Sequence, residues 1–410
     1  MNAYAILVGL LLLAWAGDAL VKPAGRRAFG LSSGTEFLLG GILLGPLGLG
    51  TISRGTLEAL SPLTAVGAAW LGLLAGTHLG FADNRRVPLK HFFAGLLLGA
   101  AAFAACALAG WALAPRILPL DDDSRLLLAL GLGAAGSETA RAAVVWSAER
   151  EGPRSPLLDL FADLAEADDV VPLVGLAALF ALAPRPEGTA LAGAPGLALV
   201  LTLGLGVCLG AIGAALTRVE ARATERWGVL LGTALLGVGL SARLGLAAPA
   251  ALFVMGLTLN QLAEDGAVLR QMLDRTTRPV LLPVVALAGA SLDLRDGRAV
   301  WWVVAAVPLV RLAVKLPLGA LFRGVVGRGV QTSRWMGLGL MSSGAITVCV
   351  GITAAERFDG PVGRLVLAAA LSSVVVGELV GPPALQRELK LAGDWTGDAP
   401  GPRPAEEGRS

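Results

Sequence analysis

Thirteen apolar segments, each close to the length that crosses a lipid bilayer, follow one another along most of the chain. A transmembrane α-helix needs about 20 predominantly apolar residues, and an open strand cannot span a membrane because its backbone groups would lack hydrogen-bond partners there. The pattern therefore predicts an all-α polytopic membrane protein. The segments cover residues 4–21, 32–50, 60–81, 91–114, 125–148, 157–182, 191–217, 227–242, 245–262, 279–293, 299–322, 335–355 and 361–383.

The composition favours the same class. Hydrophobic residues make up 55% and charged residues 16% of the 410 positions, against about 25% charged in a typical soluble domain. Glycine occupies 55 positions, and small residues let helices pack backbone to backbone in lipid, where the hydrophobic effect does not hold helices together. The net charge of +2 suggests neither a nucleic acid nor a specifically acidic partner, and the apolar composition makes the lipid bilayer the expected partner.

Lysine and arginine are unevenly distributed over the loops between these segments. With the N-terminus outside, seventeen fall in inside loops and nine in outside loops. Because cytoplasmic loops carry the excess of positive charge, we expect the N-terminus outside and the C-terminus in the cytoplasm. Residues 393–410, rich in Gly, Pro and charged residues, are expected to form a short disordered cytoplasmic tail.

The segments also divide into two six-helix halves of opposite orientation, with 191–217 between them. In this division 125–148 corresponds to 335–355. Both carry polar interruptions near mid-span, "AAGSETARA" (134–142) and "LMSSGAI" (340–346). Discontinuous helices at corresponding positions of two inverted halves indicate the transport site of a secondary transporter.

Segment 157–182 carries four acids, although a charged side chain at the bilayer centre costs roughly 2.5–3.5 kcal/mol. Asp163 lies near the expected cytoplasmic end, whereas Glu166, Asp168 and Asp169 lie deeper. Adjacent helical residues point about 100° apart, so Asp168 and Asp169 cannot both face one partner. We expect one of them to meet a cation on a neighbouring helix and the other to face a cavity.

Three cations lie inside the apolar segments, away from the segment ends, and are candidate partners: Arg141, Arg311 and Lys315. Arg311 and Lys315 are four residues apart and therefore share one helix face. We expect Lys315 to pair with Asp168, which leaves Asp169 as the carboxylate open to water.

A buried carboxylate of this kind can bind a proton or a hard cation in turn. Oxygen ligands suit Na⁺ or K⁺, and Ser137 and Thr139 are candidates to supply more of them at the interruption of 125–148, together with carbonyl groups freed there. The pattern indicates a monovalent cation site at Asp169. The alternative is a buried charge network that only holds the helices together.

Seven motifs follow one another at characteristic spacings. They are "FLLGGILLGPLGLG" (37–50), "SETA" (137–140), "DDVVPLVGLA" (168–177), "AALFVMGLTLN" (250–260), "LLPVVALAGASLDL" (281–294), "VRLAVKLPLGALFR" (310–323) and "VVGELVGPPALQREL" (375–389). In this order the chain resembles bacterial monovalent cation/proton antiporters of the second branch, the NapA-type and Kef-type exchangers, over nearly all of residues 4–392.

The resemblance implies an NhaA/NapA-like fold in which 1–392 form one transporter unit. A dimerisation subdomain and a six-helix core, with two crossed discontinuous helices, would be interleaved in that sequence. It further implies a homodimer in the bacterial inner membrane that works by elevator-type alternating access. Asp169 then resembles the ion-carrying acid, Asp168 the partner of Lys315, and Thr139 the polar residue at the helix break. The paired aspartates are similar to those of electrogenic sodium/proton exchangers, so we expect Na⁺ and H⁺ as cargo and no cofactor.

Two charged residues at the first break depart from the family pattern. Glu138 and Arg141 stand where relatives are mostly uncharged. Either the two pair with each other, or Arg141 competes with Lys315 for Asp168.

Four further residues are candidate modulators of the site. Glu166 is an additional acid one turn before Asp169, and Arg311 is a second cation beside Lys315. Ser343 lies in "LMSSGAI", where relatives frequently carry charged or amide side chains. Glu378 is either structural or a second polar ligand.

Other functions remain open. The same fold can serve an electroneutral K⁺/H⁺ antiporter or a non-transporting sensor. An intramembrane aspartyl protease needs two aspartates converging from different helices, whereas Asp168 and Asp169 are adjacent, and a diphosphate-binding prenyl-transfer enzyme needs a second acid at another spacing. We therefore expect a secondary transporter and not an enzyme.

Overall fold

The structure is a computed structural model that describes residues 34–80, 87–144, 156–184, 193–219, 222–325 and 332–392, with the single positions Gly9 and Leu191. Every regular element in these ranges is an α-helix, as the apolar pattern predicts. The expected first helix (4–21) falls outside the described residues apart from Gly9, and so does the expected tail (393–410).

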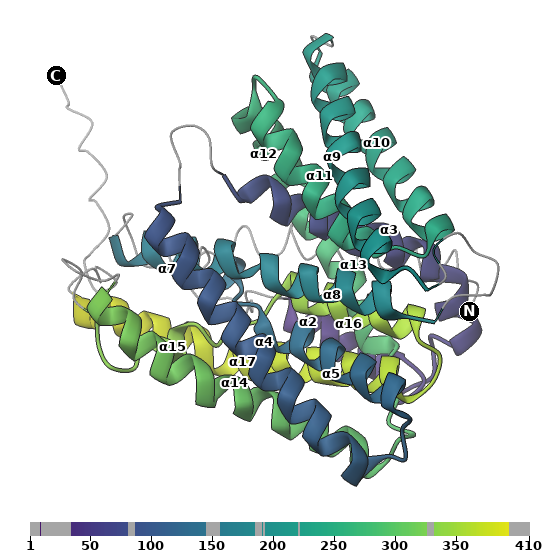
Figure 1. The fold of residues 1–410 in the computed structure, drawn as a ribbon, viewed down its shortest axis with the longest axis vertical. Helices are drawn as coiled ribbons and strands as arrows, with labels where there is room; N and C mark the ends of the chain where they lie inside the picture. The colour runs from purple at the N-terminus through teal and green to yellow at the C-terminus, as the bar shows by residue number, and fades with distance from the viewer. Residues whose placement is uncertain are drawn as a thin grey trace, which may run out of the picture.

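The helices pack into two groups, which occupy mainly the upper and the lower part of Figure 1. The α3 group consists of α2 (Thr35–Leu44), α3 (Arg54–His78), α9 (Pro195–Val219), α10 (Ala223–Leu244), α11 (Ala248–Leu262), α12 (Gly266–Asp274) and α13 (Thr277–Ala290). The α5 group consists of α4 (Leu89–Ile117), α5 (Asp122–Ser137), α7 (Pro156–Asp168), α8 (Val170–Leu182), α14 (Arg298–Val325), α15 (Met336–Gly339), α16 (Ala345–Arg357) and α17 (Pro361–Ala392). Each group has an apolar core, and α16 and α17 contribute side chains to both.

Six helices in the described ranges are long and apolar enough to cross a bilayer: α3, α4, α9, α10, α14 and α17. Helices α2, α11 and α13 are apolar but shorter. The remaining expected spans are divided. In segment 125–148 the first helix, α5, ends at Ser137. Segment 335–355 consists of α15 and α16.

Two elements differ from the expected pattern. Segment 157–182, expected as one helix, is divided into α7 and α8 at Asp169, because Pro172 has no N–H to donate to the carbonyl of Asp168 four residues earlier. Residues 266–274, expected as loop, form α12. This helix is amphipathic rather than apolar and buries Leu269 and Leu273, so a search for apolar runs does not find it.

Glycine brings α3 and α11 into backbone contact. A Cβ atom added at Gly76 would lie 2.0 Å from the carbonyl oxygen of Phe253, and one added at Gly256 would lie 2.2 Å from that of Leu73. No other residue fits at these two positions without moving the helices apart. This close packing is the use that the high glycine content predicts for helices in lipid.

The two interruptions cross in the middle of the α5 group. The first lies between Ser137 and Arg141 and the second between Gly339 and Ala345. The backbone N–H of Ala140 donates to the carbonyl of Ser342 at 3.0 Å and joins them directly. The predicted pair of discontinuous helices is therefore present, and the two breaks are in contact.

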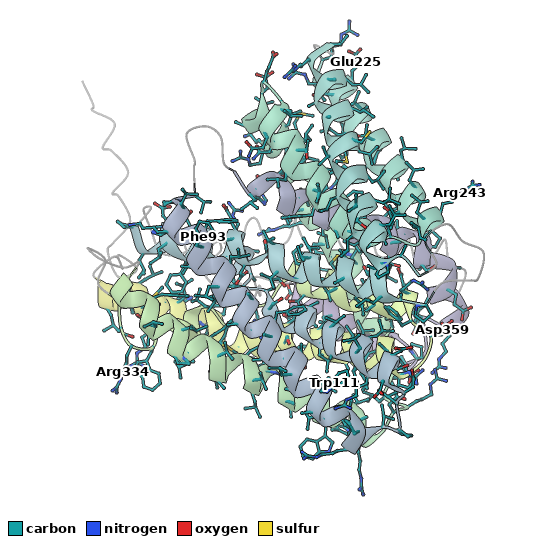
Figure 2. The ribbon with its side chains drawn as sticks, viewed as in Figure 1. Phe93, Trp111, Glu225, Arg243, Arg334 and Asp359 are labelled. Atoms are coloured by element: carbon teal, nitrogen blue, oxygen red, sulfur yellow. The ribbon has the colours of Figure 1, made fainter. Side chains whose placement is uncertain are left out.

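Loops that alternate along the chain lie on two opposite faces of the molecule. In Figure 2, Phe93 and Arg334 lie at the left and Glu225 at the top, while Trp111 lies at the bottom and Asp359 and Arg243 at the right. The first three belong to helix ends that the charge distribution assigns to the cytoplasm and the last three to ends that it assigns to the outside. The site at the crossed breaks lies between the two faces.

Candidate functional site

Asp168 is fully buried and fully bonded. Its Oδ1 accepts the backbone N–H of Thr139 at 2.9 Å, and its Oδ2 accepts the Thr139 hydroxyl. The Thr139 N–H is available because α5 ends at Ser137, so the break in one helix supplies the donors for the acid of another. A carboxylate held in this way is satisfied without an added cation.

Lys315 lies beside Asp168 but is bonded chiefly to the crossed breaks. Its Nζ is 3.8 Å from Asp168 Oδ2, and both side chains are completely buried. The ammonium donates to the Glu138 carbonyl at 2.7 Å, to Thr139 Oγ1 at 2.8 Å and to the Leu340 carbonyl at 3.2 Å. The Thr139 hydroxyl thus connects Lys315 to Asp168, and the ammonium charge lies among carbonyl oxygens at the helix breaks, where it is favourable.

Asp169 differs from its neighbour in every contact. It occupies the position before the first residue of α8 and caps no N–H group with its side chain. The residue is 8% exposed, and its Oδ1 is buried without a hydrogen-bond partner in the described part of the structure. A buried carboxylate oxygen without a donor is costly, and a bound proton or cation would remove that cost.

Glu138 binds the amino terminus of α16. Its carboxylate accepts backbone N–H groups of Gly344 at 3.1 Å, of Ile346 at 3.2 Å and of Thr347. The first N–H groups of a helix lack intrahelical partners and carry partial positive charge, which suits an anion. Glu138 therefore stabilises the second break from its place in the first.

Arg311 connects the same two breaks from α14. Its guanidinium donates to the carbonyls of Glu138 at 2.8 Å and Met341 at 3.1 Å, and to the Ser343 hydroxyl. Arg311 is 1% exposed, so these bonds replace its hydration. Its contacts are with backbone and hydroxyl oxygens, and this gives the guanidinium a positioning role in the site.

Arg141 pairs with Glu166, which corrects both pairings considered from the sequence. Arg141 Nε donates to Glu166 Oε1, and the side chains are 21% and 4% exposed. Pairing with Glu138 does not form because that carboxylate faces the start of α16, and Asp168 faces Thr139 instead.

The sequence and the fold can be compared with those of known proteins. The sequence model of the family described as sodium/hydrogen exchanger, transmembrane, matches residues 13–387. The chain belongs to the sodium/hydrogen exchanger family. No curated protein matches it in sequence. Among solved structures, it is similar to the sodium proton antiporter MjNhaP1 from Methanocaldococcus jannaschii at pH 8, with a TM-score of 0.69 and 15% identity over 93% of this chain and 98% of that chain. The expected antiporter family and fold class are confirmed.

The structure of this exchanger-family member also places three further candidate residues, Ser137, Ser343 and Glu378. The Ser137 hydroxyl donates to the Ala134 carbonyl of its own helix at 3.1 Å. Ser343 takes a bond from Arg311. Glu378 is buried on α17, next to Gly377, which contacts the backbone of the second break.

Thr347 was not found from the sequence. It lies in the first turn of α16, fully buried, and its Oγ1 has no hydrogen-bond partner in the described residues. The signal that points to it is its position, three residues after the Gly344 that ends the second break. The described residues contain no group of three or more His, Cys, Asp and Glu side chains arranged to hold a metal ion.

Proposed function

We propose that the chain is a secondary-active antiporter that exchanges Na⁺ for protons at Asp169. The observation that carries this proposal is the buried, unpartnered Oδ1 of Asp169 next to an Asp168 whose oxygens are already bonded. One carboxylate is available, so a proton and a monovalent cation compete for it. Competition for one site couples the two fluxes, because the site is neutral with either ligand.

The arrangement of the charged side chains supports movement of the site as a unit. Glu138, Arg141, Glu166, Asp168, Asp169, Arg311 and Lys315 all lie in the α5 group or in its breaks. The α3 group contributes none of them. We propose that the α5 group carries the ion past the α3 group in elevator-type alternating access.

The exchange is proposed to be electrogenic. Asp168, Thr139 and Lys315 form a second titratable unit beside Asp169. Movement of a second proton on this unit for each Na⁺ would transfer net charge. Asp168→Asn should then abolish the voltage dependence of exchange, whereas an electroneutral K⁺/H⁺ antiporter would show none in the unaltered protein.

Membrane placement and assembly follow the same reasoning. We propose a multi-pass protein of the bacterial inner membrane that works as a homodimer. The face with Arg334 and Glu225 (Figure 2) would be cytoplasmic, because the loops assigned to that side carry the larger number of cations.

The test is proton movement in proteoliposomes with an imposed pH gradient. Na⁺, Li⁺ and K⁺ are added in turn to the unaltered protein and to Asp169→Asn. We expect Na⁺ to dissipate the gradient and the variant to be inactive. A response to K⁺ alone would change the cargo, and no response to any cation between pH 6 and 9 would contradict the proposed exchange.

A further inference from the structure

The ion pair between Arg141 and Glu166 lies next to the proposed site at Asp169. Two cross-links tie the segment after α5 to α7. Thr139 bonds Asp168, and Arg141 bonds Glu166. The second link lies two residues from the first along each segment.

Glu166 and Asp169 share one face of the helix. Asp169 keeps helical backbone angles of φ −58° and ψ −24°, and its N–H donates to the Ala165 carbonyl at 3.3 Å. Residues three apart on a helix are neighbours, with Cβ atoms about 5–6 Å apart. Glu166 and Arg141 are accordingly among the charged groups that act on the Asp169 carboxylate.

Among the described charged groups that act on Asp169, Arg141 is a cation, and Glu138, Asp168 and Glu166 are acids. Arg311 and Lys315 bond instead to the crossed breaks, and Lys315 lies beside Asp168. With Arg141 on Glu166, the local trio of Glu166, Arg141 and Asp169 carries one net negative charge. A monovalent cation neutralises that trio, whereas a divalent cation would leave one buried positive charge uncompensated, which is unfavourable.

We propose that Arg141, by pairing with Glu166, restricts the site to monovalent cations. This inference rests on the proposed function and adds the residue that determines ion valence. Without the guanidinium, Glu166 and Asp169 would be two carboxylates one turn apart on the same helix face, with no cation between them. Carboxylate pairs are the ligands that Ca²⁺ and Mn²⁺ prefer, and their affinity rises with the number of ligand charges.

Equilibrium binding of Mn²⁺ to the purified full-length protein in detergent tests this directly, because it needs no transport. Free Mn²⁺ is measured by electron paramagnetic resonance for the unaltered protein, Arg141→Gln, Glu166→Gln and the double variant. We expect Arg141→Gln to bind Mn²⁺ at least about tenfold more tightly, since one ligand charge is gained. The other three should bind it equally weakly.

Two control variants test whether the loss of any arginine changes Mn²⁺ binding in the same way. Arg226 is 20% exposed and pairs with Asp265 at 2.9 Å, away from the site, so Arg226→Gln should leave Mn²⁺ binding unchanged. Arg141→Lys keeps the charge and should retain weak Mn²⁺ binding. In proteoliposomes, Ca²⁺ should inhibit Na⁺ exchange by Arg141→Gln and not by Arg141→Lys.

The results separate this inference from the proposed function. Unchanged Mn²⁺ affinity in a folded Arg141→Gln, or an equal gain in the double variant, overturns the role of Arg141. Tight Mn²⁺ binding by the unaltered protein also overturns it. Absence of Na⁺-driven proton movement in the unaltered protein overturns the exchange function instead, and the Mn²⁺ series still reports on the charge balance.

Discussion

Two adjacent aspartates acquire different roles from what surrounds them. Asp168 receives both donors of Thr139, because the end of α5 leaves that backbone N–H free. Asp169, one position later, receives none at Oδ1. The difference comes from the crossed breaks of other helices, so the chemistry of each acid is decided by tertiary structure.

The first prediction concerns the buried charge pair. Lys315→Met should lower the free energy of unfolding by about 3–5 kcal/mol, because it leaves Asp168 buried without its cation. Asp168→Asn added to Lys315→Met should restore part of that loss. Thermal unfolding of the detergent-solubilised variants measures both. Strictly additive losses would mean that the two charges, 3.8 Å apart, do not interact.

The second prediction concerns the carboxylate at the start of α16. Glu138→Gln keeps the shape and one acceptor oxygen but removes the charge that three backbone N–H groups bind. We expect a loss of about 1–2 kcal/mol in stability. Glu264→Gln is the matched control, since Glu264 is 76% exposed in its pair with Arg218 and an exposed pair contributes little. Equal melting temperatures for the two variants would contradict the capping role.

Part of this site can be predicted from the sequence. Away from their ends, the apolar segments contain only three cations, so the proximity of Lys315 to Asp168 follows from a short list of partners. The role of Glu138 was not predicted, because it depends on which of two breaks faces the other. Helix amino termini bind anions. The break in 335–355 creates such an amino terminus, and Glu138 is the acid in the corresponding break, so this contact could have been predicted.

At the level of helices, hydropathy predicts the positions of most helices, and polar interruptions predict the two crossed breaks. The breaks after Ser137 and before Ala345 lie where polar residues interrupt the apolar segments. The division at Asp169 and the amphipathic α12 were missed, because a proline effect and a one-sided apolar face leave the average hydropathy of a segment almost unchanged.

The third prediction tests backbone contact between α3 and α11. Gly76→Leu should disrupt folding, because even its Cβ would lie 2.0 Å from the Phe253 carbonyl oxygen. Overpacking of a tight contact costs about 1–3 kcal/mol or more. Gly232→Leu on α10 is the control, since nothing lies within 4 Å of a Cβ there. Size-exclusion profiles and melting temperatures compare the two, and a stable Gly76→Leu would show that the helices separate at little cost.

In the whole molecule, the site lies between two opposite sets of loops and inside one of two helix groups (Figures 1 and 2). The segregation of loops follows from alternating helices and is visible in the charge distribution. The charge distribution does not show the separation into an α3 group and an α5 group, because each group contains helices from both halves of the chain. The proposed elevator movement depends on this grouping, because the site charges all lie in the α5 group.

The central claim is that Asp169 exchanges a proton for a cation, and proton release on ion binding tests it most directly. Na⁺ is added to the purified protein in weakly buffered detergent solution near neutral pH, and the released protons are counted with a pH indicator. We predict release from the unaltered protein and none from Asp169→Asn. Na⁺ binding without proton release, or equal release from Asp169→Asn, would contradict the account.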